Sequence, residues 1–89
     1  MVEGRLRVIN RLGLHARAAA KLVHLASVFA CDIALVFDDG EEIDAKSILG
    51  ILTLGVEKGQ VLRIRALGDD AEQAVAAVVH LVQHNFGEE

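Results

Sequence analysis

Two stretches of this chain alternate between polar and apolar residues, and a third stretch is an apolar run. Residues 5–9 begin Arg-Leu-Arg-Val, and residues 61–66 are Val-Leu-Arg-Ile-Arg-Ala. The apolar run at residues 33–37 is joined to residues 42–44 by Asp-Asp-Gly-Glu, in which Asp-Gly is a favoured pair for a hairpin turn. The pattern therefore predicts four strands, with the second and third paired antiparallel.

Two further segments have the composition and spacing of helices. In residues 16–29, apolar side chains recur at helical steps and form one stripe, which consists of Ala19, Leu22, Val23, Ala26 and Phe29. Residues 48–54 are apolar nearly all round, with Ser47 as the expected N-cap and Gly55 as the terminator. One core face cannot cover so apolar a helix, so we expect part of it to be exposed.

The last helix is expected to begin at Asp69, which forms a capping-box-like pair with Glu72, and to end near Gly87. The resulting order is strand, helix, strand, strand, helix, strand, helix, without a long nucleotide-binding βαβ unit. This order predicts an α+β fold in which helices cover one face of an antiparallel sheet. A chain of 89 residues has room for a single domain, residues 1–89.

Charge and composition argue against several classes of protein. The net charge is −4, and the nine Lys and Arg residues are scattered, which disfavours a nucleic-acid surface. The N-terminus lacks the apolar run of a signal peptide, and no segment approaches the ~18 apolar residues of a membrane span. The single cysteine, Cys31, lies in an apolar stretch and is expected to be a small core residue. We therefore expect a soluble, cytoplasmic protein.

The candidate chemistry lies where the first helix begins, in the run Gly-Leu-His-Ala-Arg at residues 13–17. No Ser, Thr, Asp or Asn directly precedes this helix, so the first N–H groups, at Ala16, Arg17 and Ala18, can bind an outside anion. A neutral imidazole at His15 is a nucleophile, and Arg17 supplies a fixed charge for a phosphoryl group. The pattern favours a histidine that accepts and passes on phosphate; the alternative is an ordinary surface histidine.

The other histidines are weaker candidates. His80 and His84 are four residues apart on the last helix, a spacing that can bind metal, but no third ligand is evident and we expect both to face solvent. His24 has no obvious partner and is given no role. We expect no metal site and no cofactor. Paired carboxylates and a Gly-rich phosphate loop are also missing, which disfavours a free-standing enzyme.

Three blocks of the sequence together resemble a known family. They are Leu-Gly-Leu-His-Ala-Arg at residues 12–17, Lys-Ser-Ile-Leu-Gly-Ile-Leu-Thr-Leu-Gly at residues 46–55, and the Lys58-Gly59 turn. In this order and spacing, the chain resembles the histidine-containing phosphocarrier (HPr) family of the bacterial phosphoenolpyruvate-dependent phosphotransferase system, over nearly its whole length. The resemblance implies an open-faced β-sandwich of order βαββαβα, with a four-stranded antiparallel sheet under three helices.

The resemblance also implies a function for the histidine. His15 would accept a phosphoryl group on Nδ1 from Enzyme I, with Arg17 beside it, and pass it to sugar-specific Enzyme II A components. Such a protein is a monomeric carrier without turnover of its own. Ala18 departs from the family, in which Pro often follows the arginine; Ala keeps a backbone donor there and leaves open a sugar or a nitrogen-related branch.

Ser47 has two compatible interpretations. As an N-cap it stabilises the short helix by about 1 kcal/mol. The resemblance makes it the counterpart of a serine that a bifunctional kinase/phosphorylase modifies. A phosphate there would place about two negative charges beside the apolar short helix.

We expect four apolar residues to contact protein partners: Ala20, Ile48, Leu49 and Leu52. The alternative function is a regulatory binding module of the same fold, which docks under the control of Ser47. The presence of His15 favours the carrier, because a purely regulatory module needs no nucleophile.

Overall fold

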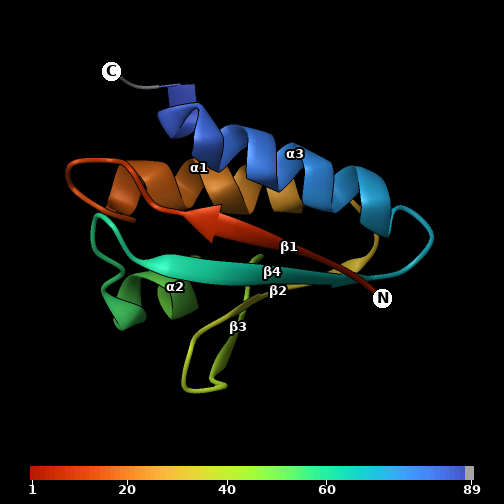
Figure 1. Ribbon diagram of the computed structural model, residues 1–89. Helices are drawn as coiled ribbons and strands as arrows, with labels where there is room; N and C mark the ends of the chain where they lie inside the picture. Colours follow the sequence, from red (N-terminus) through yellow and green to blue (C-terminus); the bar gives the residue numbers. More distant parts are fainter. Residues whose placement is uncertain (88–89) are drawn as a thin grey trace.

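The predicted strands pair into one antiparallel sheet in the computed structural model, which describes residues 1–87 (Figure 1). The strands are β1 (Val2–Arg7), β2 (Asp32–Val36), β3 (Glu42–Asp44) and β4 (Val61–Leu67). Their spatial order is β1-β4-β2-β3, so the first strand pairs with the last and β2 forms the expected hairpin with β3. In the turn, the N–H of Glu41 donates to the carboxylate of Asp39 over 2.9 Å, beside Gly40 at a φ of 88°.

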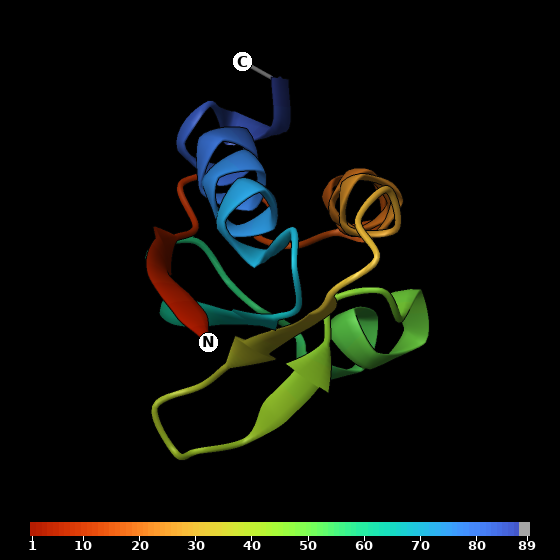
Figure 2. The ribbon, with the colours of Figure 1, turned by 90° about the vertical axis from the view of Figure 1, so that its right-hand side faces the viewer.

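Three helices lie on one side of this sheet (Figure 2). They are α1 (Ala16–Ala26), α2 (Ile48–Leu54) and α3 (Ala71–Gln83), and a short turn follows at Asn85–Gly87. Helix α3 packs on β1 and β4, while α2 lies between β3 and α1. The predicted open-faced β-sandwich of order βαββαβα is confirmed.

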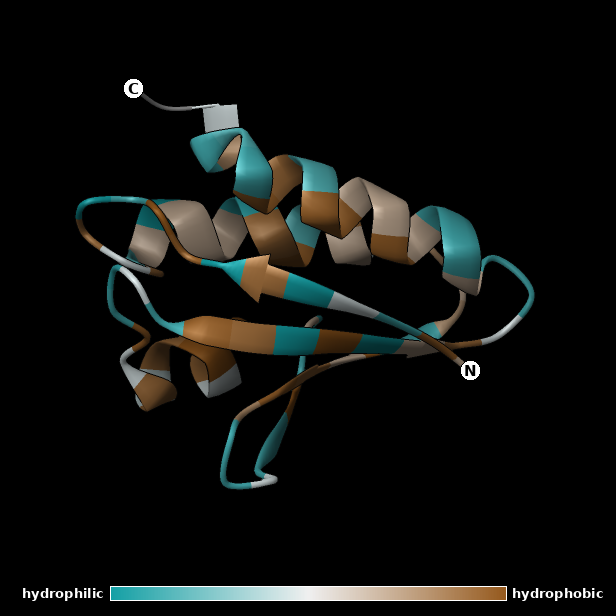
Figure 3. Cartoon of the chain, viewed as in Figure 1, coloured by the Kyte–Doolittle hydropathy of each residue, from teal (hydrophilic) through white to brown (hydrophobic). Residues whose placement is uncertain are grey.

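The core lies between the sheet and the helices, and the strand alternation fixes which side chains reach it. Leu6 of β1 and Leu62 and Ile64 of β4 are buried on the helix side. Helices α1 and α3 each turn an apolar stripe toward them, while α2 is apolar over most of its surface, as the hydropathy colours of Figure 3 show. The buried residues of α1 are Ala18, Ala19, Leu22 and Ala26, and those of α3 are Ala71, Ala74, Val75, Val78 and Val82.

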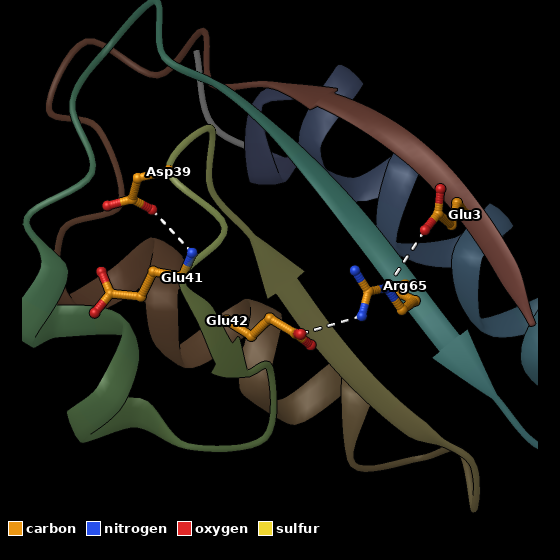
Figure 4. A network of polar contacts seen from close by, with 5 residues as sticks. All are labelled: Glu3, Asp39, Glu41, Glu42 and Arg65. Carbon is orange, nitrogen blue, oxygen red and sulfur yellow. Dashed lines mark hydrogen bonds and ion pairs between the residues drawn. The ribbon is translucent and has the colours of Figure 1, made fainter.

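The other face of the sheet is open and polar, and an arginine links its strands (Figure 4). Arg65 of β4 donates from Nε to Glu3 of β1 over 3.3 Å and from Nη1 to Glu42 of β3 over 3.1 Å. The residue opposite Arg65 on β2 is the small Ala34, over which the guanidinium reaches β3. Exposed pairs of this kind contribute at most about 1 kcal/mol each, so they support the strand register more than the total stability.

Helix α1 and strand β1 differ in extent from the prediction. Helix α1 ends at Ala26 rather than at Phe29, because the N–H groups of Val28 and Phe29 bond three residues back, which tightens the chain into a turn. Phe29 is therefore only partly buried. Strand β1 occupies Val2–Arg7 rather than residues 5–9, since its pairing with β4 begins at Val2.

The predicted capping box at the start of α3 is wrong. The N-cap is Asp70 rather than Asp69, and its side chain does not cap the helix. Its carboxylate instead accepts the N–H groups of Ala30 over 2.9 Å and Cys31 over 3.0 Å. A hydrogen bond from the Cys31 thiol, followed by that from Ala30, holds the pKa of Asp70 below its ordinary value, while burial raises the pKa of the Cys31 thiol.

The C-terminal end of α3 also differs from the prediction. The helix ends at Gln83 rather than near Gly87, because Asn85 and Phe86 have φ values of 55° and 57°, which a right-handed helix cannot accommodate. The turn buries Phe86, and Lys21 of α1 donates from Nζ to the carbonyl of Phe86 over 2.8 Å. The last described residues are thereby fixed to α1.

Candidate functional site

The loop before α1 is held against the segment that follows α2. Gly13 has a φ of 66°, and a β-carbon added to it would overlap the carbonyl oxygen of Val56. The next residue, Leu14, donates its N–H to that same oxygen over 2.9 Å. Glycine thus permits a close approach of two backbones, which fixes the point from which His15 enters the helix.

His15 is the N-cap residue of α1, as expected from its place before the helix. Its backbone is extended, with φ −71° and ψ 175°, and its side chain does not cap the helix. Its carbonyl accepts the first helical hydrogen bond, from Ala19 over 2.8 Å. The N–H groups of Ala16, Arg17 and Ala18 therefore precede the first N–H that donates within the helix, that of Ala19, and lie at the positive end of the helix dipole.

The three residues after His15 differ in exposure. The side chains of Ala16 and Arg17 are exposed, whereas Ala18 is completely buried. The methyl group of Ala18 therefore belongs to the core. Where a proline would remove an N–H at this position, alanine keeps one and fits the tight contact of α1 with its neighbours.

The sequence did not single out Asn10, which contacts the candidate histidine. Asn10 is 4% exposed, and its Nδ2 lies 3.4 Å from Nε2 of His15. Its Oδ1 accepts the N–H of Leu12 over 2.9 Å, and its carbonyl accepts the N–H of Gly13 over 2.9 Å. An Asn that follows an alternating strand is a known signal for such a turn. That signal predicts the loop but not the contact with the ring.

Helix α2 has the predicted ends. Ser47 is its N-cap and accepts the N–H of Gly50 at Oγ over 3.2 Å, and Gly55 ends it in the left-handed conformation with φ 60°. Its side chains divide between core and solvent: Ile51 is 1% exposed, but Ile48 is 37%, Leu49 76% and Leu52 39% exposed. The expectation that part of this helix is exposed is confirmed.

The exposed apolar residues lie on neighbouring helices. Ala20, on α1, is exposed, and α1 packs directly against α2 (Figure 2). We call Ala20, Ile48, Leu49 and Leu52 the apolar patch. The hydrogen bond from Leu14 to Val56 joins the loop before His15 to the end of α2, so the fold gathers the predicted features at adjacent elements.

The remaining candidates lie apart from this arrangement. His80 and His84 are exposed, as expected, and their rings stack with centroids 3.9 Å apart. His24 is exposed as well. Within residues 1–87, no three His, Cys, Asp or Glu side chains come together as a metal site, and none of the helices is long and apolar enough to cross a membrane.

The open face of the sheet carries a hollow of about 460 Å³, lined by residues that include Met1, Asp32, Ile43 and Arg65. None of the residues predicted for the site lines it. The chemistry suggested by the sequence therefore belongs to a surface at a helix end rather than to this hollow.

Comparison with known proteins agrees with this geometry. A family model described as "PTS HPr component phosphorylation site" matches residues 2–84. The chain belongs to the HPr family of phosphocarrier proteins. Members of this family are carriers rather than enzymes, and a phosphocarrier role in the phosphotransferase system follows for this chain.

Individual members of the HPr family match along nearly their whole length. The chain is 43% identical over 89 residues to the phosphocarrier protein HPr of Xylella fastidiosa strain Temecula1, covering 100% of this chain and 99% of that protein. It is 36% identical to the phosphocarrier protein NPr of Escherichia coli strain K12, covering 99% and 98%. The crystal structure of HPr-C-His from Thermoanaerobacter tengcongensis has a TM-score of 0.94 at 45% identity, covering 100% and 99%.

Proposed function

We propose that this phosphocarrier receives a phosphoryl group from Enzyme I on Nδ1 of His15 and passes it to an Enzyme II A acceptor. The observation that supports this most strongly is the position of His15 as the N-cap of α1, with a side chain that does not cap the helix. An incoming phosphoryl group beside the imidazole is thereby close to the backbone N–H groups that begin the helix.

The proposed step is an in-line transfer of the phosphoryl group to Nδ1. The lone pair of Nδ1 forms a bond to phosphorus while the bond between phosphorus and its donor breaks, and the ring releases to solvent the one proton that its neutral form carries. The N–H groups of Ala16, Arg17 and Ala18, together with the Arg17 guanidinium, stabilise the negative charge on the transferring oxygens. The backbone N–H groups need no rearrangement for the transfer, because the helix already orients them.

The apolar patch is the proposed docking surface for both donor and acceptor. Leu49 is 76% exposed. Removing a leucine side chain from water is favourable, so a partner that covers Leu49 would gain binding free energy. Ser47 caps the same helix, so a serine kinase/phosphorylase that acted on it would place charge at the edge of this surface. Docking, rather than folding, would respond.

A second function has one specific observation in its favour. The similarity to NPr extends over 99% of the chain, so a nitrogen-related branch stands beside the sugar branch. Separate incubations with Enzyme I of the sugar branch and with its nitrogen-related counterpart distinguish the branches. The preferred donor is the one with the higher kcat/KM for phosphorylation of this chain.

The experiment that tests the function is incubation with phosphoenolpyruvate and Enzyme I, followed by detection of an acid-labile phosphoryl group. We expect one phosphoryl group on His15, its loss in His15→Ala, and unchanged labelling in His24→Ala, which serves as the control for removal of a histidine from α1. Mass mapping that placed the group on His24, His80 or His84 would refute the proposal.

We further propose a cytoplasmic monomer, because one surface must meet donor and acceptor in turn. Light scattering of the free protein at working concentration tests the oligomeric state; a stable dimer would contradict it.

A further inference from the structure

The two ends of the Asn10 side chain are distinguished by their surroundings. Its Oδ1 is 2.9 Å from the N–H of Leu12, which can only donate, so an oxygen must occupy that end of the amide. The NH₂ end then faces Nε2 of His15 at 3.4 Å. The N–H of Leu12 thus fixes which end of the carboxamide meets the ring, and the amide cannot be turned to exchange its oxygen and nitrogen.

An amide NH₂ is a donor only, so the ring nitrogen that faces it must offer a lone pair. We propose that Asn10 is a positioning residue, which holds Nε2 of His15 as a hydrogen-bond acceptor and thereby prolongs the lifetime of the phosphorylated ring. In the unphosphorylated neutral ring the same contact favours the tautomer with its proton on Nδ1, and that proton must leave before the Nδ1 lone pair can attack phosphorus. The lifetime part of this proposal rests on the proposed phosphorylation of Nδ1.

The chemical consequence follows from the leaving group. When water attacks the phosphorus atom, the bond from phosphorus to Nδ1 breaks and its electron pair returns to the ring. If Nε2 carries a proton, the ring leaves as neutral imidazole; if Nε2 is unprotonated, it leaves as an anion, which is a much poorer leaving group. A donor aimed at Nε2 competes with that proton and slows the loss of phosphate to water.

The position of Asn10 suits this task. The residue is 4% exposed and its carbonyl accepts the N–H of Gly13, so both the side chain and the backbone are fixed within the loop. A 3.4 Å contact is long for a hydrogen bond, and a modest donor opposes protonation without preventing it. A partner that supplied a proton to Nε2 would restore the better leaving group at the moment of transfer.

The first test measures the ring itself and needs no phosphorylation. Long-range ¹H–¹⁵N NMR of the intact protein, with the His15 signals identified by their absence in His15→Ala, reports which nitrogen carries the proton. We expect an acceptor-type Nε2 in the wild type. Asn10→Asp keeps an acceptor for Leu12 but presents an oxygen to the ring, and it should move the proton to Nε2. A wild-type ring protonated on Nε2, or no change in Asn10→Asp, would overturn the proposal.

The second test measures the lifetime of the phosphoprotein. The hydrolysis half-life at neutral pH should be several times shorter in Asn10→Asp than in the wild type. Asn10→Ala is the control, because it loses the hydrogen bond to Leu12 and the contact with the ring but offers no acceptor to Nε2. Only Asn10→Asp favours a protonated Nε2. Equal half-lives for wild type and Asn10→Asp would refute the lifetime effect. Failure to label His15 at all would refute the proposed function, while the NMR result would still decide whether Asn10 sets the tautomer.

Discussion

Gly13 lies against the carbonyl of Val56 with no space for a β-carbon between them. We therefore predict that Gly13→Ala destabilises the protein by about 2 kcal/mol or more, because it adds a steric overlap to an unfavourable positive φ. The displaced loop should also slow phosphorylation of His15. Urea unfolding and the Enzyme I assay measure the two effects.

Gly40→Ala is the matched control. Gly40 also has a positive φ, 88°, but a β-carbon there would meet nothing within 4 Å. This variant should show only the conformational cost of about 1 kcal/mol, with phosphorylation unchanged. Equal destabilisation by the two variants would contradict the role given to the Val56 contact.

Two residues of α2 should separate binding from folding. Leu49 is 76% exposed and Ile51 is 1% exposed, although they are two positions apart. Leu49→Ala should leave the melting temperature nearly unchanged and weaken Enzyme I binding, whereas Ile51→Ala should cost about 2–5 kcal/mol of stability. Calorimetric titration and thermal melts distinguish them, and undiminished binding by Leu49→Ala would remove Leu49 from the docking surface.

Substitutions of Ser47 should separate the effect of its helix cap from the effect of a negative charge added at this position. Ser47→Ala loses the acceptor for Gly50 and should cost about 1 kcal/mol, with little change in binding to Enzyme I. Ser47→Asp keeps an acceptor and adds a negative charge, so it should preserve stability and weaken binding. If Ser47→Asp binds Enzyme I as tightly as the wild type, Ser47 has only its capping role.

Arg17 should affect transfer much more than folding, since its side chain is exposed at the start of α1. We expect Arg17→Ala to slow phosphorylation strongly and Arg17→Lys to restore it only in part, because an ammonium lacks the planar fork of a guanidinium. Arg63→Ala, which removes an exposed arginine from the open face of the sheet, controls for net charge. Wild-type rates in both Arg17 variants would exclude the proposed role.

The contribution of Asp70 to stability should depend on pH. Its pKa is lowered in the folded protein, so the stabilisation is complete above the ordinary pKa of an aspartate and is lost as the pH falls through the lowered value. Asp70→Asn should therefore reduce the melting temperature at pH 7 and do so progressively less in acid. Asp69→Asn, one residue earlier, is the control for losing a charge at this helix end. A pH-independent effect of Asp70→Asn would contradict the linkage.

Periodicity predicted the element order and the ends of α2 because these depend on local features. Ser47 and Gly55 directly flank the seven-residue helix, as its capping residue and its terminator, and both stand at the positions that the sequence predicts. The start of α3 shows the limit of such local rules. Asp70 uses its carboxylate on Ala30 and Cys31, and a contact across 39 and 40 residues leaves no trace in the spacing near the helix.

The candidate site was predicted as far as it is contiguous in sequence. His15 and Arg17 are neighbours, so the motif identified them directly. Asn10 approaches the ring because the turn at Leu12 and the Gly13–Val56 contact bring the chain back upon itself, and only the folded loop shows that. Phosphorylation of His15 stays a prediction, which the labelling experiment decides.

Helix α2 has seven residues, one of them fully buried, and this has a consequence for local motion. So short a helix is unstable on its own, and few contacts oppose its unwinding. Its amide protons should exchange with solvent well before those of α3, which buries five residues. The part of the proposed docking surface that α2 carries should therefore open more readily than α3. A partner that covers Leu49 would stabilise the whole helix, so it would slow amide exchange at all seven residues of α2 and not only at Leu49.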